Sequence, residues 1–342
     1  MSGGTTDIKV GFTCNNDCIH CVIRTNKEAL IKNNQSIDTK YAELIDLINN
    51  EEVANSSSLV VTGGEPTMRK DFKRLIRYIH KRHPHIKIAL QTNGRELYKY
   101  LDEFHEKGIN IEYIIAIHGE ETVHNAITNV SKGNPYQETM KSIDRIIELY
   151  PENYGNLRIE VVLSRENIEY INPLIQKLHE KGIHHIGISY PHLDGMYCQN
   201  EEETKKVGFP YSKMKAVMPE MIEYAKKKEK LLLGLEKVPR CMYRKHDDTI
   251  AEQPPNIQRM EMNMEQQTNV IYPGEEMINF NTTYLDMHRY AKACDKCVMK
   301  KERKCFGVWE ETIEMFGEEG FTPISKEEYD KVISKEEVIR CS

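Results

Sequence analysis

The sequence predicts an α/β fold: a partial (β/α)6 barrel followed by a smaller, irregular C-terminal domain. Strand-like apolar runs alternate with helix-like periods from residue 8 to about residue 195, and this alternation has stopped by residue 236. The 342 residues are enough for one large domain and a smaller one. Six strands fall short of the eight that close a barrel, so we expect an open side. The expected parts are a barrel at 5–195, a linker with a helix at 196–235, and a C-terminal domain at 236–342.

Each expected strand is an apolar run that ends in polar residues. The strands are expected at 8–13, 58–62, 86–92, 111–118, 158–164 and 185–190. Helices whose apolar residues recur every three or four positions are expected at 37–50, 71–82, 95–107, 136–150 and 171–181. Asp38 or Thr39 is expected to cap the first of these helices, and residues 122–137 to form a capping segment before 136–150. A polar linker at 196–210, a helix at 211–228 and a strand at 231–235 follow.

The composition excludes several classes of protein. The net charge of −6 argues against nucleic acid as a partner, because no basic field would attract it. No apolar stretch approaches 18 residues, so no transmembrane helix is expected, and the N-terminus lacks the pattern of a signal peptide. Nine cysteines without a secretory signal indicate metal ligands in a reducing, cytoplasmic setting rather than disulfides.

Three cysteines follow the first expected strand. Cys14, Cys18 and Cys21 are spaced C-x3-C-x2-C, so a tight loop can direct their thiolates into one small volume. Three thiolates fit three irons of a [4Fe-4S] cube, and no fourth ligand is present in the loop, which leaves one iron open. Three clustered cysteines can also form a zinc site.

With His20 before the third cysteine, this stretch resembles the radical S-adenosylmethionine (radical SAM) enzymes, whose hallmark is C-x3-C-x-φ-C with φ usually aromatic. A second hallmark of that family, Gly-Gly-Glu-Pro, follows the strand at 58–62. The resemblance implies an oxygen-sensitive [4Fe-4S] cluster that binds SAM at its open iron, and therefore an anaerobic setting. It also implies reductive cleavage of SAM to a 5′-deoxyadenosyl radical, which abstracts a hydrogen atom from a substrate, and a partial barrel.

Polar residues after the expected strands would gather at one rim of the barrel, where parallel sheets bind ligands. Glu65 is expected to accept from the ammonium group of SAM, and Arg165 to pair with its carboxylate unless it is an ordinary surface charge. Asn93 is expected either to contact SAM or to be only a turn residue, and His118 either to bond SAM or to be only structural. Val162 is expected to contact adenine or to pack in the core. The residues expected to bind SAM are His20, Gly63, Gly64, Glu65, Pro66, Asn93, His118, Val162 and Arg165.

A second group of cysteines lies in the C-terminal part: Cys241, Cys294, Cys297 and Cys305. Four such thiolates suit zinc or a fully ligated [4Fe-4S] cluster, and their spacing does not choose between them. The resemblance favours one auxiliary cluster, because some radical SAM enzymes carry C-x2-C-x5-C-x-G in a C-terminal SPASM or twitch-like extension. Here the second gap is seven residues, two longer than the commonest form.

The resemblance also bears on the substrate. The resemblance favours an oxidoreductase or maturase that modifies a ribosomally made peptide, with flavodoxin or ferredoxin as electron donor. A small-molecule radical dehydrogenase or cofactor-biosynthesis enzyme is the alternative, and a non-catalytic iron–sulfur redox protein is an alternative of another class. Cys198 is either an ordinary thiol or a hydrogen-atom donor, and Cys341 is expected to be uninvolved. Only seven residues precede the first expected strand, so we expect any leader-binding domain to come from a partner.

Overall fold

The computed structural model describes residues 4–151, 155–193, 201–228, 230–244, 257–260, 268–271, 278–279 and 287–333. The chain forms two compact units. Unit 1 comprises residues 1–160 and 262–283, and unit 2 comprises residues 161–261 and 284–342. These limits differ from the expected boundaries at 195 and 235, and the domains named above stay a prediction.

Unit 1 is built on a sheet with strand order β10-β9-β1-β2-β3-β4-β5, in which every pair is parallel except β10 with β9. Its strands are β1 (Thr5–Lys9), β2 (Ser58–Thr62), β3 (Lys87–Thr92), β4 (Ile111–Ala116), β9 (Thr268–Ile271), β10 (Ile278–Asn279) and β5 (Leu157–Val162), the last as far as residue 160. Residues Thr5 to Lys9 pair in step with Ser58 to Thr62. The residues that follow β1 and β2 therefore leave the sheet side by side.

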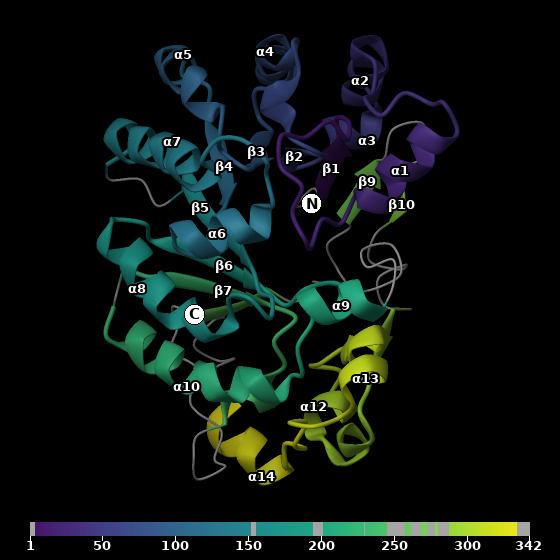
Figure 1. Ribbon diagram of the computed structural model, residues 1–342, viewed down its shortest axis with the longest axis vertical. Coiled ribbons are helices and arrows are strands. Elements are labelled where there is room, and N and C mark those ends of the chain that lie inside the picture. Colours follow the sequence, from purple (N-terminus) through teal and green to yellow (C-terminus); the bar gives the residue numbers. More distant parts are fainter. Residues whose placement is uncertain are drawn as a thin grey trace. The chain divides into compact units, whose positions relative to one another are not determined.

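Helices of unit 1 cover this sheet, and Figure 1 shows α2, α4 and α5 beside one another along strands β1 to β4. Helix α4 buries Phe72, Leu75, Ile76 and Ile79, which share one face at helical spacing. Asn134 caps α7 by accepting from Gln137 N. The helices are α1 (Arg24–Lys32), α2 (Tyr41–Ile48), α3 (Glu51–Ala54), α4 (Phe72–Arg82), α5 (Leu101–Glu106), α6 (Glu121–Thr128) and α7 (Pro135–Leu149), with 3-10 turns η1 (Pro66–Met68) and η2 (Leu97–Lys99).

Unit 2 contains the parallel strands β6 (His185–Ser189), β7 (Leu232–Glu236) and β8 (Ile257–Met260), and a short antiparallel pair, β11 (His288–Arg289) and β12 (Val308–Trp309). Its helices are α8 (Ile171–Glu180), α9 (Glu201–Val207), α10 (Ser212–Lys226), α12 (Val298–Lys301), α13 (Glu310–Phe316) and α14 (Lys326–Glu328). Short turns of other helix types are η3 (Ile168–Tyr170), η4 (Arg240–Tyr243), η5 (Lys292–Lys296) and η6 (Tyr329–Ile333). Nowhere in the described ranges is a helix long and apolar enough to cross a bilayer.

The expected parallel α/β fold is confirmed, and the strand expected at 58–62 matches β2 to the residue. The first strand lies at 5–9 rather than 8–13, because the chain beyond Val10 turns to bond a different segment: Phe12 N donates to Ile37 O. The strand at 231–235 belongs to a sheet with β6 and not to a linker. Several helices were not expected, among them α1, α6, which spans 121–128 at the start of the expected capping segment, and α9, which occupies 201–207 of the expected polar linker.

Candidate functional site

The three N-terminal cysteines lie in one loop after β1, and their thiols influence one another electrostatically. Burial raises the pKa of Cys14 to about 11, with the charges of Glu65 and Cys21 adding to it and a bond from Asn16 N opposing it. Burial also raises the pKa of Cys18, and the charges of Cys21 and Cys14 raise it further. A thiol with a raised pKa stays protonated at neutral pH unless a bound metal stabilises the thiolate. Iron in an iron–sulfur cluster is a metal that binds thiolates well. The structure thus brings the three predicted ligands together.

The arrangement of the donors bears on the choice between zinc and a cluster. A tetrahedral zinc ion with Zn–S bonds of about 2.3 Å needs its sulfurs within about 4 Å of one another. Among the described residues, no three His, Cys, Asp or Glu side chains are arranged to hold one metal ion. A cube is less demanding, because each cysteine binds a different iron and the sulfurs stay farther apart. Three soft thiolates in one loop suit the irons of a cluster, with one cysteine for each iron.

Asp38 fixes the entry to the cysteine loop. Its Oδ1 accepts from Phe12 N at 3.1 Å and from Thr13 N at 3.0 Å, and its Oδ2 accepts from Thr13 Oγ1 at 2.6 Å. The expectation that Asp38 or Thr39 caps α2 is wrong, since the N-cap of α2 is Lys40. Asp38 serves the cysteine loop instead, because its carboxylate satisfies two backbone N–H groups that have left the sheet.

The Gly-Gly-Glu-Pro segment runs against the same loop. Gly64 N donates to Gly11 O at 2.7 Å, and Glu65 N donates to Thr13 O at 2.8 Å. A Cβ atom on Gly64 would overlap the Thr13 carbonyl, and one on Gly63 would overlap Gly11 O. Only glycine permits this approach of backbone to backbone. The two sequence hallmarks are therefore packed against each other.

Glu65 is buried, with 2% of its surface exposed, and holds the ends of β2 and β3 together. Its Oε1 accepts from Thr67 N, Thr67 Oγ1 and Thr92 Oγ1 at 3.0, 2.6 and 2.6 Å, and its Oε2 accepts from Asn93 N at 2.7 Å. Burial raises the pKa of Glu65 against the opposing effect of these bonds. Its four bonds give the carboxylate a structural role, and the expected contact with the SAM ammonium group stays a prediction.

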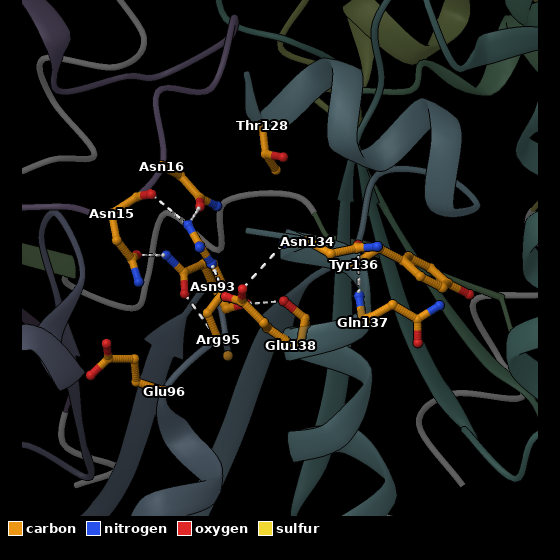
Figure 2. A network of polar contacts seen from close by, with 12 residues as sticks. Asn15, Asn16, Asn93, Arg95, Glu96, Thr128, Asn134, Tyr136, Gln137 and Glu138 are labelled. Carbon is orange, nitrogen blue, oxygen red and sulfur yellow. Dashed lines mark hydrogen bonds and ion pairs between the residues drawn. The ribbon is translucent and has the colours of Figure 1, made fainter. Parts of the chain in front are cut away.

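Asn93 and Arg95 follow β3 and reach the spacer between Cys14 and Cys18 (Figure 2). Asn93 Nδ2 donates to Asn15 Oδ1 at 2.6 Å and lies 3.9 Å from Cys14 Sγ. Asn93 is therefore more than a turn residue. Arg95 was not identified from the sequence, because a single arginine beside Asn-Gly carries no signal of a partner eighty residues away.

Three histidines form a buried group beside the loop. The rings of His20 and His118 meet edge to face with centroids 4.4 Å apart, and His118 stacks on His124 at 5.7 Å. Burial lowers the pKa of His20 to about 4 and that of His118 well below its ordinary value, so both rings are neutral at pH 7. Within the described part of the chain, His20 Nδ1 is buried without a hydrogen-bond partner. An unsatisfied ring nitrogen beside the cysteines fits a site that receives a polar ligand.

The histidine group predicts a loss of stability in acid. Burial lowers the pKa of His124 to about 4, below its ordinary value of 6.5. As the pH falls from 6.5 towards 4, the unfolded chain therefore takes up a proton that the folded chain does not. We expect this ring alone to reduce the free energy of unfolding by about 1–2 kcal/mol between pH 7 and pH 5. Chemical denaturation of wild type and His124→Asn at both pH values measures the difference.

The matched control for this prediction is His105→Asn, since His105 lies at an exposed position of α5. Asparagine at 124 can still accept from His118 N through its Oδ1, as His124 Nδ1 does at 3.1 Å. The prediction is wrong if His124→Asn and wild type lose equal stability between the two pH values.

Unit 2 brings the second cysteine group together. Cys241, Cys294, Cys297 and Cys305 line one cavity, which encloses about 450 Å³ of space including its opening to solvent. Burial and the charges of Cys305 and Cys294 raise the pKa of Cys241 to about 12. Cys297 Sγ accepts from Ile324 N at 3.3 Å, a bond of the kind that supports cluster sulfurs. The four predicted ligands thus share one site.

The remaining expected residues lie in unit 2, in the turn after Glu65 or outside the described residues. Val162 is half-buried at the end of β5, and Arg165 is exposed, with Nη1 3.5 Å from Lys205 O. Both belong to unit 2, and their roles toward SAM stay predictions. Pro66 begins the turn η1 behind Glu65. Cys198 and Cys341 lie outside the described residues.

Comparison with curated proteins finds similarity to GTP 3′,8-cyclases. The enzyme of Vibrio vulnificus (strain YJ016) is 24% identical over 159 residues, which are 46% of this chain and 45% of that protein. The enzyme of Vibrio cholerae serotype O1 (strain ATCC 39541 / Classical Ogawa 395 / O395) is 29% identical over 110 residues, or 32% of this chain and 31% of that protein. The chain spans less than half the length of these relatives.

Solved structures share the fold at low identity. Native anSMEcpe with bound AdoMet and Kp18Cys peptide gives a TM-score of 0.63 at 13% identity, over 98% of each chain. Streptococcus suis SuiB bound to precursor peptide SuiA gives 0.58 at 16% identity, over 81% of this chain and 59% of that one. The family model described as the Radical SAM superfamily matches residues 8–178, which are half of the chain and include the three cysteines and the Gly-Gly-Glu-Pro segment. The chain therefore belongs to the radical SAM superfamily.

Proposed function

We propose that Cys14, Cys18 and Cys21 hold a [4Fe-4S] cluster whose open iron binds SAM. The observation that carries this is that three half-buried thiols act on one another within the loop against which Gly63 and Gly64 pack. When bound, a cluster of this kind supplies a 5′-deoxyadenosyl radical by one-electron cleavage of SAM. The chain's own part is to hold SAM and substrate in place and to keep water away.

Several residues would hold SAM beside the loop. The backbone of Gly63 and Gly64 would approach its methionyl end, and the free ring nitrogen of His20 would bond to a polar atom of the ligand. Asn93 and His118 would contribute further polar contacts. Arg165 would pair with the SAM carboxylate, and Val162 would contact adenine. A low ring pKa suits His20 to this role, since a neutral imidazole offers a donor and an acceptor without adding charge.

A peptide is our first proposal for the substrate. Support comes from the shared fold of SuiB, which was solved with a precursor peptide, and of anSMEcpe, which was solved with a peptide. The enzyme would then be a maturase of ribosomally made peptides, working in the cytoplasm under anaerobic conditions with flavodoxin or ferredoxin as electron donor.

Cofactor biosynthesis is the second candidate, because the GTP 3′,8-cyclases align with this chain over nearly half its length. Deuterium transfer separates the two candidates. A substrate whose hydrogen is abstracted leaves deuterium in 5′-deoxyadenosine, so fully deuterated GTP and fully deuterated candidate peptides can be supplied separately. Label arriving only from GTP would reject the peptide proposal.

We further propose that Cys241, Cys294, Cys297 and Cys305 hold an auxiliary [4Fe-4S] cluster. Four thiols around one cavity would ligate all four irons and leave none for SAM. Zinc is the competing occupant. Either would brace the C-terminal fold, whereas only a cluster could accept an electron from substrate.

Anaerobic reconstitution tests these proposals together. Wild type should bind about eight irons, and the triple variant Cys14/Cys18/Cys21→Ala about four, with 5′-deoxyadenosine formed only by wild type after reduction with SAM. About four irons plus zinc in wild type would make the C-terminal site a zinc site. If protein with both clusters, reduced and supplied with SAM, forms no 5′-deoxyadenosine, the proposal of an enzyme is rejected in favour of a non-catalytic redox protein.

A further inference from the structure

Arg95 is a buried arginine that joins three segments of unit 1. Its side chain is 9% exposed and extends from the end of β3 towards the cysteine loop, as Figure 2 shows. Nη1 donates to Asn15 O at 2.5 Å and to Asn16 Oδ1 at 2.9 Å, while Nε donates to Glu138 Oε2 at 2.6 Å. A buried guanidinium with this many partners is held in one orientation.

The loop atoms that Arg95 binds lie between two of the proposed iron ligands. Asn15 and Asn16 are the first two residues of the three-residue spacer that separates Cys14 from Cys18. Asn16 N donates to Cys14 Sγ at 3.4 Å, so the conformation of the spacer also fixes that sulfur. The spacer is thus held in part by groups of the chain itself.

Glu138 orients the guanidinium from the opposite side. It lies in the first turn of α7, and its Oε1 accepts from Asn134 N at 3.2 Å. Burial acts to raise the pKa of Glu138, but the bonds from Arg95 and Asn134 hold it below its ordinary value, so the ion pair persists at neutral pH. Gly133 makes room for the pair, because a Cβ there would press on both Glu138 Oε1 and Arg95 Nη2.

The other half of the loop has a separate attachment. Asp17 N donates to Thr128 O and Ile19 N donates to Ile127 O, both at 3.0 Å, at the end of α6. The Cys18 side of the loop is therefore held by backbone bonds to α6. The backbone of Asn15, beside Cys14, is held by the side chain of Arg95, which a substitution can remove.

We propose that Arg95, oriented by Glu138, is a positioning residue that holds the Cys14–Cys18 spacer in its metal-binding form before any cluster is present. The inference rests on the proposed function in one respect, namely that these cysteines hold a cluster. It adds a residue that the superfamily motifs do not include, and it predicts that the metal-free loop is already ordered.

The test compares full-length Arg95→Gln and Arg95→Lys with wild type. In reconstituted protein, we expect a chelator to remove iron from the N-terminal site about tenfold faster in Arg95→Gln, the effect usual for residues that support metal ligands. Arg95→Lys should restore part of the difference, because an ammonium group keeps the charge and some donors but not the fork. Arg145→Gln is the matched control, since Arg145 is a half-exposed arginine on α7, paired with Asp102 and Glu148.

Hydrogen exchange on the metal-free chain supplies the second measurement. Amides of residues 14–17 should exchange about tenfold faster in Arg95→Gln, while those of 140–148 in α7 stay protected. This result would support the role of Arg95 even if the reconstituted protein forms no 5′-deoxyadenosine. Failure of the proposed function can therefore be told apart from failure of this inference. The inference is overturned if both rates stay within twofold of wild type, or if the loop and α7 lose protection together, as in general unfolding.

Discussion

Gly64→Ala is expected to remove most of the iron from the N-terminal site. The new methyl group would point at the carbonyl of Thr13, one residue before the first proposed ligand, and at the carbonyl carbon of Phe12. Both are backbone atoms, which cannot rotate away as a side chain would. The cysteine loop must therefore shift, or the bonds of Gly64 N and Glu65 N to it must break. We expect a cost of about 1–3 kcal/mol in folding stability, as for other overpacked sites, and loss of 5′-deoxyadenosine formation.

Gly108→Ala is the control for this prediction. Gly108 has a φ of +63°, which is strained for alanine, yet no atom lies within 4 Å of the position its Cβ would take. It thus tests backbone strain without the collision. Iron content and 5′-deoxyadenosine are measured for both variants after reconstitution. Full loading of Gly64→Ala would show that the two hallmark segments can separate without harm to the site.

Glu65→Gln is expected to destabilise the chain by about 2–3 kcal/mol, even though the side chain keeps its shape. The carboxylate accepts from four donors, and an amide offers only one oxygen in its place. If the amide nitrogen faces Asn93 N, two donors meet in a buried position. If it faces the other way, the donors from Thr67 and Thr92 lose their acceptor. Denaturant unfolding of the metal-free chain measures the loss.

Glu43→Gln provides the comparison, because Glu43 is exposed on α2 and its carboxylate accepts from Lys40 N. A change of less than about 0.5 kcal/mol is expected there. If Glu65→Gln is equally mild in unfolding but still abolishes SAM cleavage, the carboxylate acts on the ligand rather than on the fold. That outcome would favour the contact with the SAM ammonium group expected from the resemblance.

Much of the fold was predictable because its signal is local. The period of apolar residues located α4 and β2 almost to the residue, since burial on one face decides both. Helix α1 has no such signal, because it buries no residue in the structure. The strand β7 was recognised as a strand but not as part of a sheet, since pairing depends on distant partners.

Only those site residues that belong to a sequence motif could be predicted. Cys14, Cys18 and Cys21 follow from spacing, but the groups that hold their loop do not. Asp38 has the usual signature of a helix cap and instead accepts from Phe12 and Thr13, which lie 25 or 26 residues away. Contacts of this kind depend on the tertiary fold, and the periodicity of apolar residues in the sequence does not predict them.

Helix α1 begins three residues after Cys21, and none of its nine residues is buried. An element that contributes nothing to the core can change its side chains with little effect on folding. Substitutions should therefore be tolerated very unevenly along the first part of the chain. A loop that accepts almost no change would adjoin a helix whose exposed positions, such as Ile31, accept nearly any residue compatible with helical structure. Arg24 is the exception at the start of α1, because its Nη2 donates to Cys18 O at 2.8 Å. The exposed end of α1 therefore offers a place to introduce a label close to the cysteines in sequence.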